Sequence, residues 1–152
     1  MPILPFDEEP APLLPRPEYA DSSGLLVVTS EANDPFRVER TFLIRPNGGQ
    51  VRGDHAHRTC SQFFIAVSGS FLIRLQVGRR VRELTLADPD QGLLVRPMVW
   101  ASETATSSNS ALLVLCDEIF HPDEYIRDPD EFAQESEILT HGLFDWANWR
   151  EI

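Results

Sequence analysis

The sequence predicts an all-β fold, a sandwich or barrel of short strands with one helix near the C-terminus. Three observations lead to this prediction. Between residues 24 and 118 the chain is a series of short apolar or alternating segments separated by turn residues. No helical pattern interrupts the series, and many short strands at regular spacing are typical of β-sandwiches and barrels. After residue 121 the pattern changes and a helix-start signal appears.

The length of 152 residues fits one domain with a sizeable core. We divide the chain into an N-terminal arm, residues 1–23, and a single domain, residues 24–152, that ends in a helical tail. The arm holds six prolines in its first 17 positions. Because proline fixes φ and has no N–H to donate to a sheet, we expect an extended segment outside the core.

The strands of the domain follow in chain order. We expect them at GLLVVTS (24–30), FRVERTFLI (36–44), QFFIAV (62–67), SFLIRLQV (70–77), VRELTL (81–86), LLVRP (93–97), VWAS (99–102) and SALLVLCDE (110–118). Successive strand residues point to opposite faces of a sheet. In the segment 70–77, alternation therefore places four apolar side chains on one face, Phe71, Ile73, Leu75 and Val77.

The tail carries the helix signal. Asp128 is a plausible N-cap, Pro129 stands at the first helical position, and acidic residues follow in the first turn. We expect one helix from about Pro129 to Leu139. Tyr125 and Arg127, just before it, are expected to anchor the tail on the barrel.

The stretch VRGDHAHRTCSQ, residues 51–62, carries the chemistry. On a strand, His55 and His57 point to the same face. A transition-metal site needs three or four good ligands, and Gln62 is a weak one, while the other histidines lie in the tail region. The pattern favours a metal-free acid/base pair, for which histidine suits because its pKa lies near neutrality. A metal site and a histidine pair without function remain as alternatives.

Charge and composition exclude several functions. The net charge of −11 argues against broad nucleic-acid binding, which needs many side chains that neutralise phosphates. The apolar runs fall short of the roughly 20 residues of a membrane-spanning helix, so we expect no membrane partner. Cys60 and Cys116 give no disulfide framework, and we interpret them as reduced thiols of a cytoplasmic protein.

Two blocks of the sequence resemble a known family. RGDHAHR, followed by Gln62 and VSGS, and then ALLVLCDEIFHPDEYIRDPDEF are similar to the WxcM-like dTDP-sugar 3,4-ketoisomerases of the cupin superfamily, over roughly residues 24–135. The resemblance implies a cupin-type jelly-roll barrel with a short C-terminal helix, paired as a homodimer, that needs no metal or other cofactor. It also implies an isomerase of deoxysugar biosynthesis that moves the keto group of a dTDP-4-keto-6-deoxyhexose from C4 to C3.

For that reaction we predict His55 and His57 as the catalytic acid and base, with their division of labour left open. Arg52 is predicted to stabilise an enediolate or bind the diphosphate, and Gln62 to bond a sugar hydroxyl or orient a histidine. The remaining predicted substrate contacts are Arg40, Arg45 and Arg74 on the diphosphate and Trp100 stacked on the sugar or the base. Three alternatives stay open: a non-catalytic sugar-nucleotide-binding cupin, a related cupin epimerase, and a metal-dependent cupin enzyme such as a small dioxygenase.

Overall fold

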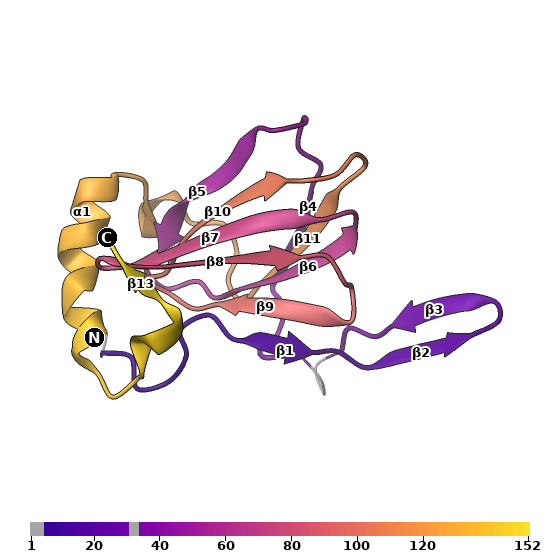
Figure 1. Cartoon of the computed structure of the whole chain (residues 1–152), viewed down its shortest axis with the longest axis horizontal. Helices are drawn as coiled ribbons and strands as arrows, with labels where there is room; N and C mark the ends of the chain where they lie inside the picture. The colour runs from indigo at the N-terminus through magenta and orange to yellow at the C-terminus, as the bar shows by residue number, and fades with distance from the viewer. Residues whose placement is uncertain (1–4, 31–33) are drawn as a thin grey trace.

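The structure, a computed structural model, describes residues 5–30 and 34–152. Its body consists of two sheets that face each other, and every strand pair in the described residues is antiparallel (Figure 1). The five-stranded sheet has the order β1 (Leu13–Pro15), β9 (Gln91–Val95), β6 (Gln62–Ser68), β11 (Ala111–Cys116), β4 (Arg40–Ile44). The six-stranded sheet has the order β12 (Tyr125–Ile126), β5 (Val51–His57), β10 (Trp100–Ala105), β7 (Phe71–Val77), β8 (Arg80–Leu86), β13 (Arg150–Glu151). The all-β prediction is confirmed.

The core lies between the two sheets. The face of β7 that the sequence predicts to be apolar is fully buried, whereas Arg74 and Gln76 lie on the other face. The opposite sheet contributes buried side chains from β6 and β11, namely Phe64, Ala66, Leu112 and Val114. Burial of this apolar surface is the main favourable term that holds the sheets together.

The N-terminal segment does not lie wholly outside the core as expected, because Ala11 is fully buried in it, and it contributes two strands that the sequence did not predict, β1 and β2. β1 lies within the proline-rich segment and pairs with β9 at the edge of the five-stranded sheet. β2 (Glu18–Asp21) and β3 (Gly24–Val27) form a separate hairpin that projects away from the body (Figure 1). Of the strand expected over 24–30, only Gly24–Val27 forms, and it pairs with β2 and not with the barrel.

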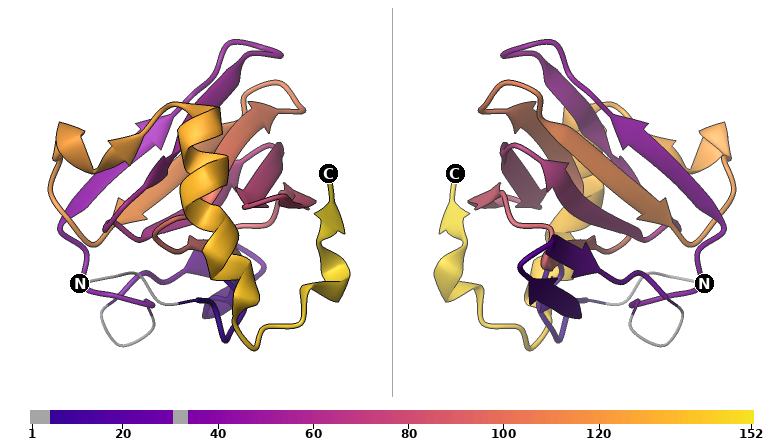
Figure 2. Two further views of the ribbon diagram at one scale, coloured as in Figure 1. Left: turned by 90° about the vertical axis from the view of Figure 1, so that its left-hand side faces the viewer. Right: turned by 90° about the vertical axis from the view of Figure 1, so that its right-hand side faces the viewer.

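The C-terminal segment closes one end of the sheets. The helix α1 (Pro129–Ser136) begins where predicted, and the Asp128 carboxylate caps it by accepting hydrogen bonds from the N–H groups of Asp130 and Glu131. It continues as a 3₁₀ turn, η2 (Glu137–His141), and packs across the end of the sheets (Figure 2). Phe132 of α1 contacts Trp100 with ring centroids 5.4 Å apart. The shorter 3₁₀ turns are η1 (Pro122–Glu124) and η3 (Trp146–Asn148).

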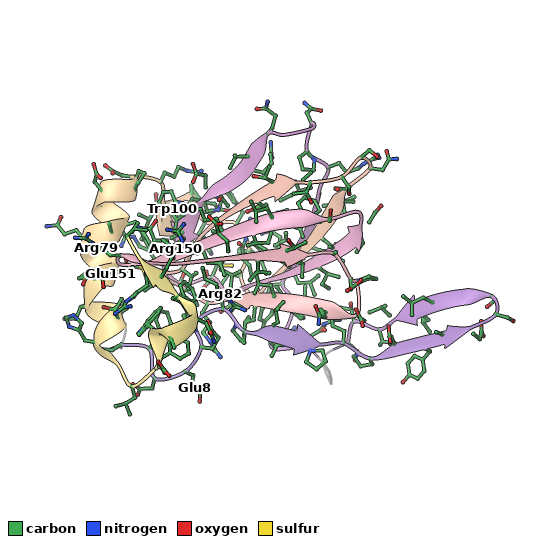
Figure 3. All side chains as sticks on the ribbon, in the orientation of Figure 1. Glu8, Arg79, Arg82, Trp100, Arg150 and Glu151 are labelled. Atoms are coloured by element: carbon green, nitrogen blue, oxygen red, sulfur yellow. The ribbon has the colours of Figure 1, made fainter. Side chains whose placement is uncertain are left out.

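The N-terminal segment is bonded both to β8 and to the C-terminal segment. Arg82 of β8 donates to the carbonyl of Ala11 at 3.0 Å, and Trp149 Nε1 donates to Glu9 at 3.4 Å. Figure 3 labels Arg82 and Glu8 at the end of the body where the C-terminal segment lies. Over the described ranges, no helix is long and apolar enough to cross a membrane.

Candidate active site

A β-bulge in β5 aims the histidine pair. The register between β5 and β10 shifts so that Ala101 pairs with His55 and Ser102 with Gly53, which leaves Asp54 as the extra residue. Gly53 and Asp54 both have positive φ, 73° and 61°. Trp100 Nε1 donates to the Asp54 carboxylate at 2.9 Å and fixes the bulge. The GD of the RGDHAH motif is therefore the bulge that precedes the two histidines.

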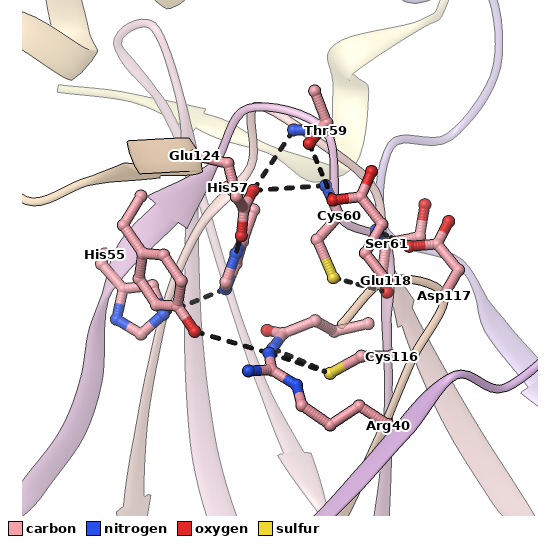
Figure 4. A network of polar contacts seen from close by, with 12 residues as sticks. Arg40, His55, His57, Thr59, Cys60, Ser61, Cys116, Asp117, Glu118 and Glu124 are labelled. Atoms are coloured by element: carbon pink, nitrogen blue, oxygen red, sulfur yellow. Dashed lines mark hydrogen bonds and ion pairs between the residues drawn. The ribbon is translucent and has the colours of Figure 1, made fainter. Parts of the chain in front are cut away.

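The two imidazoles meet edge to face. His55 Nε2 lies 3.1 Å from His57 Nε2, and the ring centroids are 4.8 Å apart (Figure 4). His55 Nδ1 lies 3.0 Å from the carbonyl oxygen of Gly53. Because a carbonyl oxygen only accepts, Nδ1 of His55 carries the proton in this contact and Nε2 presents a lone pair.

Glu124 orients His57. The strand β12 pairs with β5, Tyr125 opposite His57, and this pairing brings the preceding residue, Glu124, to His57 Nδ1, which donates to its Oε1. The other carboxylate oxygen accepts from the backbone N–H groups of Thr59 and Cys60, both at 3.3 Å. Glu124 is 9 % exposed, so this carboxylate is a buried acceptor with three donors around it. Such a partner fixes the tautomer of a histidine and leaves Nε2 free to accept a proton.

The pair is held in its basic form. Burial, together with the charge of a protonated His57, lowers the pKa of His55 from 6.5 to about 4. Burial also lowers the pKa of His57, against the opposing effect of the bond to Glu124. The lowered pKa values favour the unprotonated pair, in which two Nε2 lone pairs oppose each other across 3.1 Å, a repulsion that one proton between them relieves. One incoming proton can be shared between them, which is the property required of a base that removes a proton from carbon.

The histidines line a cavity of about 240 Å³ between the sheets. Its polar lining comes from six side chains, Arg52, His55, His57, Gln62, Glu103 and Tyr125. Its apolar lining includes Phe42, Leu43, Ile44, Phe64, Val95 and Val99. A concave, mostly apolar site with a few convergent polar groups is the usual form of a small-molecule site.

A buried cysteine, Cys116, accepts hydrogen bonds from two side chains of the site. Arg40 donates to Cys116 Sγ at 3.6 Å and to the Tyr125 hydroxyl at 3.4 Å, and Gln62 donates to Cys116 Sγ at 3.5 Å (Figure 4). The neighbouring Cys60 and the donors Arg40 and Gln62 lower the pKa of Cys116. Gln62 thus contacts a cysteine rather than orienting a histidine, and Arg40 reaches the site through Tyr125.

Three of the predicted substrate contacts lie away from the cavity in this chain. Arg45 follows the far end of β4, beside Asn47 and Asn109. Arg74 lies on the outer face of β7, 3.7 Å from Glu83. Trp100 is 5 % exposed and is occupied by Asp54 and Phe132. The structure therefore unites His55, His57, Arg52 and Gln62, with Arg40 beside them, and separates the other three.

Sequence reasoning missed three groups of the site, of which Glu103 and Tyr125 line the cavity and Glu124 lies behind His57. Glu124 and Tyr125 belong to the block DEYIRD, whose only signal was its resemblance to the family. The predicted anchoring role of Tyr125 does not include its ring contacts with His55 and His57, at centroid distances of 4.9 and 4.4 Å. Glu103 stands in a short alternating strand and had no signal of its own. Its burial depends on the pairing of β10 with both β5 and β7.

One group in the described residues has the composition of a metal site. A histidine nitrogen of His57, the sulfur of Cys60 and a carboxylate oxygen of Glu124 all lie within 4.8 Å of one another. His57 Nδ1 and Glu124 already bond each other, and the second oxygen of Glu124 accepts from two backbone N–H groups. A metal ion at this place would have to replace the hydrogen bond that orients His57. His55 does not belong to the group.

Two facing antiparallel sheets with a histidine pair on the cavity wall define a cupin-type protein with a site built for acid/base chemistry. The chain belongs to the FdtA family, described as WxcM-like, C-terminal, which matches residues 13–137. It is 36 % identical over 116 residues to TDP-4-oxo-6-deoxy-alpha-D-glucose-3,4-oxoisomerase of Aneurinibacillus thermoaerophilus, an alignment that covers 75 % of this chain and 84 % of that protein.

Solved structures agree with this assignment. QdtA, a sugar 3,4-ketoisomerase from Thermoanaerobacterium thermosaccharolyticum crystallised with TDP, matches with a TM-score of 0.80 and 29 % identity over 84 % of this chain and 94 % of QdtA. A mutant of QdtA was solved with TDP-4-keto-6-deoxyglucose. A 3,4-ketoisomerase from Helicobacter canadensis matches with a TM-score of 0.77 and 31 % identity over 82 % and 95 % of the two chains.

Proposed function

We propose that this chain is a sugar-nucleotide 3,4-ketoisomerase that moves the keto group of TDP-4-keto-6-deoxyglucose from C4 to C3. The observation that carries the proposal is the pair of facing Nε2 atoms of His55 and His57 on the cavity wall, in a chain 36 % identical to an enzyme of that activity. Such a pair can transfer a proton to and from carbon. The relatives act on a 4-keto sugar nucleotide, a substrate whose isomerisation needs this transfer.

The reaction needs a base at carbon and a partner for the sugar oxygens. A lone pair of the histidine pair takes the proton from C3, and the electrons of that bond form the C3–C4 double bond of an enediolate with its charge on the C4 oxygen. The C3 hydroxyl proton passes to the C4 oxygen, C3 becomes the new carbonyl, and the same imidazole returns its proton to C4. Arg52, at the cavity wall, stabilises charge on the oxygens or binds the diphosphate.

Turnover in deuterated water tests the activity. The protein is incubated with TDP-4-keto-6-deoxyglucose and the sugar is followed by NMR. We expect a 3-keto product, which carries deuterium at C4 to the extent that the imidazolium proton exchanges with solvent before it is returned. Asparagine in place of either histidine should abolish turnover while thermal unfolding stays close to that of the parent protein. Full activity in both variants would overturn the site assignment.

The same experiment separates the alternatives. A non-catalytic binding protein would bind TDP in calorimetry without isotope exchange. An epimerase would invert a stereocentre and leave the keto group at C4. A metal-dependent enzyme would retain stoichiometric metal through dialysis, with His57, Cys60 and Glu124 as the group that could hold it. We expect turnover to persist after treatment with a chelator, because His57 works through its hydrogen bond to Glu124.

We further propose that the protein is a homodimer in the cytoplasm, where Cys60 and Cys116, both free and buried, stay reduced. The hairpin β2–β3 supports the dimer, because a lone two-stranded hairpin is only marginally stable in water. Its exposed apolar side chains are Tyr19, Leu25 and Leu26. A second copy is the partner that would cover them. Sedimentation should give a dimer that Leu26→Asp weakens, and a monomeric parent protein would refute this part.

A further inference from the structure

Glu103 is an acid that the family resemblance does not explain. It stands on β10, opposite Arg52 of β5 and Ile73 of β7, and its side chain lines the cavity with the histidines. The residue is 4 % exposed. Its Oε2 is buried and has no hydrogen-bond partner in the described part of the chain. A buried carboxyl oxygen without a partner is costly, so its retention in a ligand cavity points to a ligand.

The backbone makes room for this carboxyl group. A Cβ atom added to Gly53 would lie 2.5 Å from Glu103 Oε2 and 2.8 Å from Oε1. Only glycine permits that approach, and its φ of 73° is also one that glycine adopts without strain. The residue that starts the bulge therefore serves two side chains: it turns His55 toward the cavity and it admits Glu103 next to it.

The surroundings hold Glu103 in its neutral form. Burial raises the pKa of Glu103 to about 8, Arg52 opposes this rise, and Asp54 adds to it. These two are the charged groups that face it from β5. On β7 its partner is the apolar Ile73, and the cavity wall across from it, from β4 and β6, includes Phe42 and Phe64. A carboxylic acid that keeps its proton at neutral pH donates hydrogen bonds and transfers protons.

We propose that Glu103 is the proton shuttle between the two sugar oxygens in the proposed ketoisomerase reaction. Glu103 Oε2–H gives its proton to the C4 carbonyl oxygen while the histidine pair removes the C3 proton, and a neutral enediol forms. The Glu103 carboxylate then takes the proton of the C3 hydroxyl, C3 becomes a carbonyl, and the imidazolium returns its proton to C4. Protons and electrons balance, and Glu103 ends each cycle as it began. The histidine pair is then left with the carbon proton alone.

The step rests on the proposed function, and Glu103→Gln tests it. Glutamine keeps the size and can still form hydrogen bonds, but it cannot transfer a proton. We expect kcat to fall by about a hundredfold or more with KM within about threefold. Glu83→Gln, an equal change on the outer face of the same sheet, should keep the kcat of the parent protein. A purely structural role for Glu103 would show as altered unfolding without this split between kcat and KM.

The pH profile gives a second readout that needs no variant. The kcat/KM of the parent protein, which reports ionisations of the free protein, should fall as pH rises through about 8, where Glu103 loses its proton, and this alkaline limb should be absent from Glu103→Gln. An unchanged kcat in Glu103→Gln, or an alkaline limb that persists in it, would overturn the shuttle while the isomerase stands. Failure of the parent protein itself to convert TDP-4-keto-6-deoxyglucose would instead overturn the proposed function.

Discussion

Replacing Glu124 by glutamine should reverse the tautomer of His57. Both oxygens of Glu124 accept hydrogen bonds. Oε1 accepts from His57 Nδ1, and Oε2 accepts from the backbone N–H groups of Thr59 and Cys60. Glutamine has only one acceptor oxygen. If the glutamine oxygen faces the N–H groups of Thr59 and Cys60, both of those hydrogen bonds are kept. If the oxygen instead faces His57, these two buried N–H groups lose their acceptor, at a cost of about 1–3 kcal/mol each. The amide NH₂ therefore faces His57 Nδ1, and the proton of His57 moves to Nε2.

The cost in activity follows from the lost lone pair. With Nε2 protonated, His57 can no longer accept the carbon proton, and we expect kcat to fall by about 10²–10⁴, the range of general acid/base effects. The same carboxylate-to-amide change in serine-protease triads costs about 10⁴-fold. A hydrogen bond to a neutral amide is weaker than one to a carboxylate, so the free energy of unfolding should fall by only about 1 kcal/mol, which lowers Tm by about 2–4 °C.

Two measurements decide the matter. Steady-state turnover gives kcat, and ¹⁵N NMR of the imidazole nitrogens reports which nitrogen of His57 carries the proton. Glu118→Gln is the matched control, because Glu118 accepts from the Thr59 hydroxyl at 2.9 Å on the same side of the site but does not bond His57. Normal kcat in Glu124→Gln with the proton still on Nδ1 would refute the reasoning.

Three further predictions concern stability and the bulge. Gly53→Ala should lower the free energy of unfolding, measured by denaturant titration, by at least about 1–2 kcal/mol, because its φ is 73° and the new Cβ meets Glu103. Gly48→Ala, whose new Cβ would have no neighbour within 4 Å, should leave the free energy of unfolding unchanged. Burial lowers the pKa of His55 from 6.5 to about 4, so the unfolded chain binds more protons between these pH values and stability should rise with pH there; a His55→Asn variant with the same rise would count against this. Trp100→Phe should cost about 1 kcal/mol through its lost bond to Asp54 and leave KM within about twofold, whereas a large rise in KM would restore its predicted substrate contact.

The sequence predicted the fold well because alternation reports burial directly. The apolar face of β7 and the capped start of α1 depend on neighbours in sequence, and both form as expected. The histidine pair was found for the same reason, since residues two apart on a strand share a face. These signals are local, and local patterns survive in the folded chain.

The missed groups depend on pairings between distant segments. Glu124 reaches His57 only because β12 joins the edge of the sheet beside β5, 67 positions away in the sequence. Arg45 and Arg74 were proposed from charge alone, and charge does not say which face of a strand or which end of a sheet a side chain occupies. Trp100 was ambiguous between stacking and packing, and its contacts with Asp54 and Phe132 place it in the packed end of the barrel.

The prolines of the N-terminal segment give the five-stranded sheet a finished edge. On either side of β1, Arg16 N–H donates to the carbonyl of Asp90 and the carbonyl of Pro12 accepts from Leu94, so the alternate residues Leu13 and Pro15 turn their backbone groups outward. Pro15 is one of those outward positions, and it has no N–H to offer. A further strand cannot bond fully along this side, so it gives no template for edge-to-edge aggregation. Self-association of the chain is thereby directed to other surfaces.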